Sequence, residues 1–316
     1  MLHKKKIHLL ECQFNRFGAM FSDQKDIKEG LKKLYNLNII NLTKPKLNDL
    51  IKIIKKIPKN EVIIFLSIRI SLLFLISLTF SRNFGCVYHF IPRKRYLIHK
   101  IMIMFMSNIY FGTHSQSLKK ILENKMDVSK INFVPSCLIK PLSSKFKKIG
   151  KKKLNFFIPK YEINKNNKID FFKIIKNFEK KGILIGKIYI QDKYYLADAT
   201  KEYKDKVVLL NKFLNYSDYI KILNQSHYLI KFWDKKYETR CSGTILDCIK
   251  KNIIFFSNSH PINIQYGLNK TLVVDKIIKY NSKEVLKRQY QFQNYYPIQK
   301  SFQLYWIKFI NKINQN

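Results

Sequence analysis

The sequence predicts an α/β protein of two domains, each built on a parallel β-sheet with helices on both faces. The chain has 316 residues, 46% of them hydrophobic, which exceeds the commonest size of one domain and supplies apolar surface for two cores. Short β-branched and aromatic runs alternate with helical patterns, as in repeated strand–helix–strand units. A basic stretch nearly free of large apolar residues, 143–153, interrupts this alternation. We therefore expect domains at 1–142 and 154–300, a linker between them, and an amphipathic helix at 301–316.

The first half of the chain shows six strand patterns separated by five helical ones. Strands are predicted at 6–12, 38–42, 61–68, 86–90, 109–112 and 130–134, and helices at 23–35, 46–57, 70–82, 96–106 and 115–125. The stretch 62–80 is roughly long enough to span a bilayer, but Arg69 lies at its middle. Because its character changes from β-branched to leucine-rich, a buried strand followed by a buried helix is the favoured interpretation.

The alternation resumes after the linker. Strands are expected at 155–158, 182–185, 207–210, 228–232, 253–257 and 272–274, and helices at 171–180, 216–225, 243–251 and 283–292. The linker 143–153 is interpreted as a solvated connection, with a phosphate-binding strip as the alternative.

The charge balance is strongly basic. Lys and Arg number 60 against 21 Asp and Glu, which gives a formal net charge of +39. A surplus of this size favours nucleic acid, an anionic bilayer surface or phosphorylated small molecules as partners. Aromatic residues, 14% of the chain, could stack on bases, so a basic nucleic-acid-binding α/β protein without catalytic activity is the main rival interpretation. Against it, most aromatic residues fall within apolar strand or helix patterns.

The five cysteines are scattered and form no CxxC pair. We therefore expect neither a structural zinc site nor a dithiol redox site, and no metal site is assigned. A reduced, cytoplasmic protein fits this usage of cysteine.

A polar loop before the helix expected at 243–251 carries the most informative chemistry. It contains Glu238, Arg240, Ser242 and Gly243, and the helix begins near Thr244. Free N–H groups and the helix dipole favour phosphate at such a position. A guanidinium matches phosphate bidentately, and glycine lets the backbone approach. The alternatives are a surface charge for Arg240 and a simple helix cap for Ser242.

The window 206–258 resembles the GT-B glycosyltransferases, in particular the group 1, family 4-like enzymes of bacterial polysaccharide and lipopolysaccharide biosynthesis. Arg240, Ser242 and Gly243 of this loop match that family, and Asp247 stands in the place of its ribose-binding glutamate. Two positions depart from the pattern. Thr239 replaces the first of the paired glutamates, and the nearest acid, Glu238, lies one residue before that position. Asn252 replaces a glycine. The resemblance implies two Rossmann-like domains whose parallel sheets face a central cleft.

The same resemblance implies transfer of a sugar from a nucleotide diphosphate donor to a growing, lipid-linked surface glycan. Arg240 and the helix N–H groups would stabilise the departing diphosphate without a metal ion, and the nucleotide-sugar is a substrate, so no cofactor is expected. Asp247 would hold the ribose. Lys160 and Lys165 follow the first strand of the second half, where related enzymes place basic residues against the diphosphate; chance placement is the alternative.

Two catalytic candidates lie at strand ends in the first half, because ligands bind at the carboxyl edge of a parallel sheet. His89 ends the strand expected at 86–90 and could act as a base or bond the donor sugar. Glu11 ends the first strand and could face the acceptor. A buried structural histidine is the alternative for His89, and His114 has the same ambiguity.

Basic residues surround the apolar run 101–105. They are Arg93, Lys94, Arg95 and Lys100. This arrangement suits docking to anionic lipid headgroups, and a core helix with basic ends is the alternative. If these basic residues dock on lipid headgroups, the sequence predicts a peripheral enzyme at the inner face of the cytoplasmic membrane.

Overall fold

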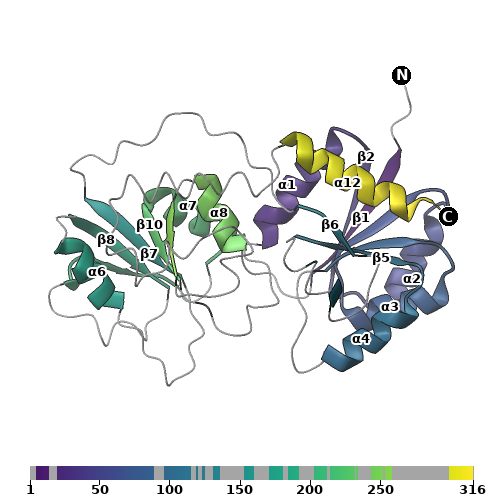
Figure 1. Cartoon of the computed structure of the whole chain (residues 1–316), viewed down its shortest axis with the longest axis horizontal. Helices are drawn as coiled ribbons and strands as arrows, with labels where there is room; N and C mark the ends of the chain where they lie inside the picture. The colour runs from purple at the N-terminus through teal and green to yellow at the C-terminus, as the bar shows by residue number, and fades with distance from the viewer. Residues whose placement is uncertain are drawn as a thin grey trace.

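The computed structural model has two α/β domains, each built on one parallel sheet (Figure 1). It describes residues 5–13, 20–88, 96–114, 119, 123–124, 131–135, 153–159, 171–180, 184–191, 203–211, 214–231, 233, 243–251, 253–257 and 299–315. The fold class expected from the sequence is confirmed. The strand expected at 272–274, the helix expected at 283–292 and residues 143–152 of the linker lie outside the described residues.

The first sheet has six parallel strands in the order β2-β1-β3-β4-β5-β6. They are β1 (Lys6–Gln13), β2 (Asn36–Thr43), β3 (Val62–Ser67), β4 (Phe84–Val87), β5 (Ile109–Thr113) and β6 (Ile131–Phe133). Each overlaps a strand expected from the sequence. Both β2 and β4 begin two residues before the strands expected at 38–42 and 86–90.

Helices cover both faces of this sheet. They are α1 (Met20–Lys32), α2 (Leu47–Lys56), α3 (Ile70–Thr79), α4 (Tyr96–Phe105) and α12 (Gln299–Ile313). Alternate residues of β3 point to opposite faces: Ile63 and Phe65 share a core with α2, α3 and α4, whereas Val62 and Ile64 share one with α1 and α12.

The apolar stretch 62–80 folds as two elements. β3 ends at Ser67 and α3 begins at Ile70, with Arg69 as its N-cap residue. In the part of the chain that the structure describes, no helix combines the length and apolar character needed to cross a membrane. The interpretation as a strand followed by a helix is therefore confirmed.

Helix α12 follows the second domain in sequence but packs on the first (Figure 1). The indole Nε1 of Trp306 donates a hydrogen bond to the carbonyl of Pro135 at 3.0 Å. Near the end of the helix, the Asn83 side-chain amide donates to the carbonyl of Ile313 at 3.1 Å. The last turn of the chain is therefore tied to the first sheet.

Two of the nine glycines permit the close approach of α12. A Cβ atom at Gly30, in α1, would lie 2.4 Å from the Phe302 ring. One at Gly85, in β4, would lie 2.6 Å from Ile313 Cδ1 and 3.3 Å from the Phe309 ring. Helix α12 fills the space that a side chain at either position would need, which explains why both residues are glycine.

The second sheet has five parallel strands in the order β11-β10-β7-β8-β9. They are β7 (Leu154–Ile158), β8 (Ile185–Ile190), β9 (Val207–Leu209), β10 (Tyr228–Ile230) and β11 (Ile254–Phe256), with helices α6 (Phe171–Glu179), α7 (Tyr216–Gln225) and α8 (Gly243–Lys251). Aromatic rings fill the core: Phe156 stacks on Tyr228 at 5.0 Å between centroids, and Tyr228 stacks on Phe256 at 5.4 Å.

The strand expected at 182–185 was placed too early, since β8 runs from Ile185 to Ile190. The Asn155 side chain accepts a hydrogen bond from the N–H of Lys187 at 2.8 Å, and the β7–β8 register shifts at the same point. A Cβ at Gly186 would lie 2.4 Å from this Asn155 oxygen. The irregular start of the strand breaks the alternation by which strands are predicted.

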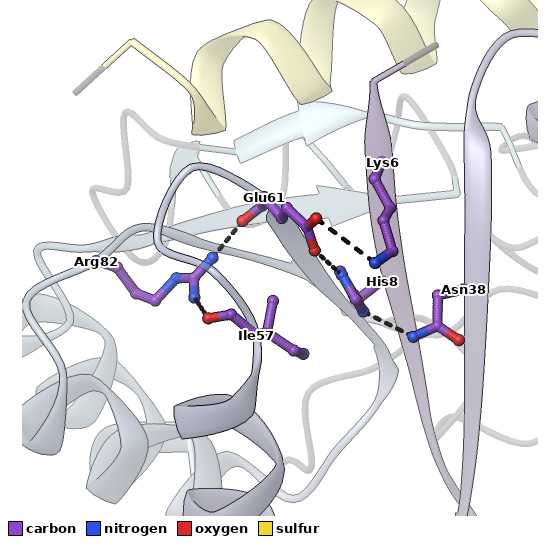
Figure 2. A network of polar contacts seen from close by, with 6 residues as sticks. All are labelled: Lys6, His8, Asn38, Ile57, Glu61 and Arg82. Atoms are coloured by element: carbon purple, nitrogen blue, oxygen red, sulfur yellow. Dashed lines mark hydrogen bonds and ion pairs between the residues drawn. The ribbon is translucent and has the colours of Figure 1, made fainter. Parts of the chain in front are cut away.

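A polar network fixes the amino ends of three strands of the first sheet (Figure 2). Nδ1 of the buried His8 accepts a hydrogen bond from the Asn38 amide at 3.0 Å, so Nε2 carries the proton that it donates to Glu61 at 2.5 Å. This hydrogen bond, together with the nearby Lys6 ammonium at 3.5 Å, lowers the pKa of Glu61. The Arg82 guanidinium donates to the backbone carbonyl of Glu61. The network lies at the edge opposite to the one where parallel sheets bind ligands.

Candidate functional site

In the first sheet, the order of the strands reverses between β1 and β3, and ligands bind beside the carboxyl ends of strands at such a point. Glu11, a catalytic candidate from the sequence, lies there, opposite Ser67 and at a register shift in the pairing. Its side chain is buried, and the Lys28 ammonium of α1 lies 2.7 Å from Oε1. A buried carboxylate of this kind can accept a proton from a hydroxyl group.

His114 follows β5 at the same edge of the sheet. It is 1% exposed, and its Nδ1 lies 2.8 Å from the carbonyl oxygen of Val134, just after β6. Nδ1 therefore carries a proton and ties the ends of two strands together. This contact favours the structural interpretation of His114.

The order of the second sheet reverses between β7 and β10, and Lys231 follows β10 directly. Its ammonium lies 4.8 Å from the centroid of the buried Trp233 ring. Burial lowers the pKa of Lys231 to about 8. Sequence reasoning missed both residues; the available signal was a lysine and a tryptophan just after a buried strand. A partly desolvated ammonium at this position is suited to bind an anion.

Helix α8 brings Thr244 and Asp247 to the same region of the second domain. Asp247 is 2% exposed, and its Oδ2 accepts a hydrogen bond from the Tyr219 hydroxyl of α7 at 3.2 Å. The Thr244 side chain lies near the same hydroxyl. Burial, then the charge of Asp247, raises the pKa of Tyr219 well above its usual value. Tyr219 therefore stays protonated and holds the carboxylate in place.

The buried thiol of Cys248 connects these groups electrostatically. Burial raises its pKa, the Asp247 carboxylate raises it further, and the Lys231 ammonium lowers it. Lys231 and Asp247 therefore both lie near the Cys248 thiol in α8, so we treat them as one cluster. We call Lys231, Trp233, Tyr219, Thr244 and Asp247 the α8 cluster.

Gly243 is the first residue of α8, as the sequence predicts, so the positive end of the helix dipole adjoins the α8 cluster. The other predicted donor-site residues, Glu238, Arg240, Ser242, Lys160 and Lys165, lie outside the described residues, as do His89, Arg93, Lys94 and Arg95. Of the predicted site residues, the structure brings Gly243, Thr244 and Asp247 together. It places Glu11 in the other domain and the partly exposed Lys100 on α4.

The two domains meet where α1 contacts α8 (Figure 1). Helix α1 carries Lys28, the partner of Glu11, and α8 carries Asp247. The Glu11–Lys28 pair of the first domain and the α8 cluster of the second therefore both involve helices at the domain contact.

The described residues contain no group of three or more His, Cys, Asp or Glu side chains placed to hold a metal ion. Three of the cysteines, Cys12, Cys86 and Cys248, are buried free thiols. Burial raises the pKa of Cys12 to about 12 and also raises that of Cys86, so these two thiols stay protonated at neutral pH.

No family model matches the sequence, and no curated protein matches it. Solved structures do match over nearly the whole chain. The glycotransferase of kitacinnamycin has a TM-score of 0.56 at 8% identity, covering 99% of this chain and 100% of that one. The lipopolysaccharide outer core galactosyltransferase WaaB has a TM-score of 0.54 at 12% identity, covering 97% and 99%. A UDP-N-acetylglucosamine 2-epimerase has a TM-score of 0.55 at 11% identity, covering 91% and 90%. The two parallel-sheet domains and these matches show that the chain has the GT-B fold.

Proposed function

We propose that the protein transfers a sugar from a nucleotide diphosphate donor to a glycan acceptor. The observation that carries this proposal is the α8 cluster, which places an ammonium and a carboxylate beside a helix N-terminus at the reversal point of the second sheet. The names of two structural neighbours, a glycotransferase and a galactosyltransferase, support the same reaction class.

Each group of the cluster suits one part of such a donor. Lys231 and the N–H groups of the first turn of α8 would bind the diphosphate and stabilise it as it leaves, so a metal ion is not required. Asp247, held by Tyr219, would accept hydrogen bonds from the ribose hydroxyls. Arg240, Ser242 and Glu238 in the preceding loop, with Lys160 and Lys165, would complete the donor site.

The acceptor hydroxyl requires a base, and Glu11 and His89 are the candidates. The Glu11 carboxylate is buried beside one ammonium at the carboxyl edge of the first sheet. We assign it the role of receiving the acceptor proton, with His89 as the alternative.

The acceptor is proposed to be a lipid-linked surface glycan, and the reaction to take place at the inner face of the cytoplasmic membrane. The net charge of +39 favours an anionic surface, and Lys100 with Arg93, Lys94 and Arg95 supplies charge beside an apolar helix. The galactosyltransferase WaaB, one of the structural neighbours, is named for the lipopolysaccharide outer core.

The rival function, nucleic-acid binding, requires aromatic rings that are accessible to bases. Many of the large aromatic side chains that the structure describes are fully buried, among them Trp306, Tyr203, Tyr228, Phe156 and Phe255. Their burial favours small anionic ligands over single-stranded nucleic acid.

Titration calorimetry with uridine, guanosine and thymidine diphosphates and their sugars tests the proposed function. We expect one nucleotide to bind, and Asp247→Ala to weaken it roughly tenfold or more, because a charge-assisted hydrogen bond contributes about 1.5–3 kcal/mol. Asp205→Ala, which removes a carboxylate remote from the α8 cluster in sequence, should leave the affinity unchanged. The proposal fails if no nucleotide binds, or if both variants bind equally well.

A further inference from the structure

Helix α4 presents an apolar face to solvent. Leu97, Met104 and Phe105 are each 67% exposed, Ile98 is 53% exposed and Ile101 is 48% exposed. Their spacing places all five on one side of the helix. The opposite side faces the interior of the domain. There, Nδ1 of the buried His99 lies 2.5 Å from the hydroxyl oxygen of Tyr88. The helix thus buries a polar side chain and exposes large apolar ones.

Helix α3 extends this face. Leu75 is 42% exposed and Leu78 is 63% exposed, and α3 contacts α4 along the same side of the first domain (Figure 1). Seven of the ten large hydrophobic side chains that are exposed in the described part of the chain belong to these two helices. Exposed apolar side chains that gather in this way mark an interaction site. We call this surface the α3–α4 face.

The segment of sequence that contains α3 and α4 is basic. No Asp or Glu occurs in the sequence between Glu61 and Glu123. That segment contains eight basic residues: Arg69, Arg82, Arg93, Lys94, Arg95, Lys100, Lys119 and Lys120. Of these, Arg69 is exposed at the start of α3 and Lys100 lies on α4 itself. Basic side chains beside an exposed apolar face are complementary to an anionic lipid surface.

We propose that the α3–α4 face inserts into the interfacial layer of an anionic bilayer, with Arg69 and Lys100 contacting lipid phosphates. Each helix has ten residues, which is too short to span a bilayer, so both helices lie along its surface. The long aliphatic stems of the basic side chains let their charged ends reach the headgroups while the stems cover apolar surface. This inference extends the proposed function, in which the acceptor is lipid-linked, by naming the surface that docks.

Vesicle flotation with the full chain and no nucleotide tests the inference. Wild type should float with phosphatidylglycerol-containing vesicles and much less with pure phosphatidylcholine vesicles. The double variant Leu97→Ser/Phe105→Ser should bind the anionic vesicles roughly tenfold or more weakly, because two large apolar side chains no longer enter the lipid. The matched control, Leu184→Ser/Leu304→Ser, removes two leucines of 55% and 54% exposure elsewhere and should float as wild type does.

The inference is overturned if wild type does not float, or if both double variants float equally well. It is also overturned if Leu97→Ser/Phe105→Ser still binds vesicles as wild type does but no longer self-associates in sedimentation velocity. The last result would show that a second copy of the chain covers the face. Thermal unfolding verifies that both double variants are folded. Nucleotide binding is measured separately, so vesicle binding without nucleotide binding refutes the proposed function but not the docking surface.

Discussion

At the residue scale, Lys231 offers the sharpest test of the proposed donor site. Its pKa of about 8, caused by burial, means that the ammonium loses its proton just above neutral pH. If the proton is needed to bind a diphosphate, affinity should fall as pH rises through 8, by up to about tenfold per pH unit. Calorimetric titration between about pH 7 and 8.5 checks this slope, because the terminal phosphate is then mostly ionised and the nucleobase has not yet lost a proton.

Two lysine variants separate this effect from general charge effects. Lys231→Met should weaken binding at pH 7 and flatten the pH dependence. Lys187→Met removes an exposed lysine of β8 and should keep the slope of the wild type. A steep pH dependence that persists in Lys231→Met would assign the titration to another group.

Single residues of the site could be predicted from the sequence only where a local pattern marks them. The position of Asp247, five residues into an expected helix and after a polar loop, was visible in the sequence. Lys231 was not, because lysine is so abundant that one more carries no signal. Tyr219 gains its role through a hydrogen bond to Asp247 across two helices. That contact depends on tertiary packing, which no local pattern encodes.

At the scale of elements, the contact between α1 and α12 predicts an unusual effect of Gly30→Ala. In a helix interior this change normally stabilises by about 1 kcal/mol, because alanine has the higher helix propensity. Here the added Cβ would lie 2.4 Å from the buried Phe302 ring, so we expect destabilisation of about 1–3 kcal/mol. Chemical denaturation measures the free energy of unfolding.

A double-mutant cycle isolates the cause of this effect. In a Phe302→Leu background, the smaller side chain should relieve the clash, so that adding Gly30→Ala costs less than in wild type. An additive cycle, or a stabilising Gly30→Ala, would show that α12 adapts to the added methyl group without strain.

Elements with regular periodicity could be predicted, and irregular ones could not. The strand-to-helix change within 62–80 was visible because β-branched residues give way to leucines. The start of β8 was missed because Gly186 and the Asn155 side chain replace regular pairing there. The amphipathic character of 301–316 predicted a helix, but its place on the first domain depends on small residues at Gly30 and Gly85, far away in the sequence.

At the scale of the whole molecule, the α/β alternation predicted two parallel-sheet domains, since helices must cover both faces of each sheet. The alternation does not encode which strands are neighbours. The α8 cluster adjoins the point where β10 lies beside β7, two strands separated by β8 and β9 in the chain. Likewise, the contact of α1 (Met20–Lys32) with α8 (Gly243–Lys251) joins the two domains through helices that are far apart in the sequence.

The net charge of +39 leads to a prediction for the whole chain. Like charges repel within the folded molecule more than in the expanded unfolded chain, so salt should stabilise the fold. Raising NaCl from about 10 to 150 mM shortens the screening distance from about 30 to 8 Å. We expect the midpoint of thermal unfolding to rise over this range. Sodium phosphate at the same ionic strength should raise it further, because phosphate also occupies an anion site. A midpoint that falls with NaCl would show that attractive pairs such as Lys28–Glu11 outweigh the general repulsion.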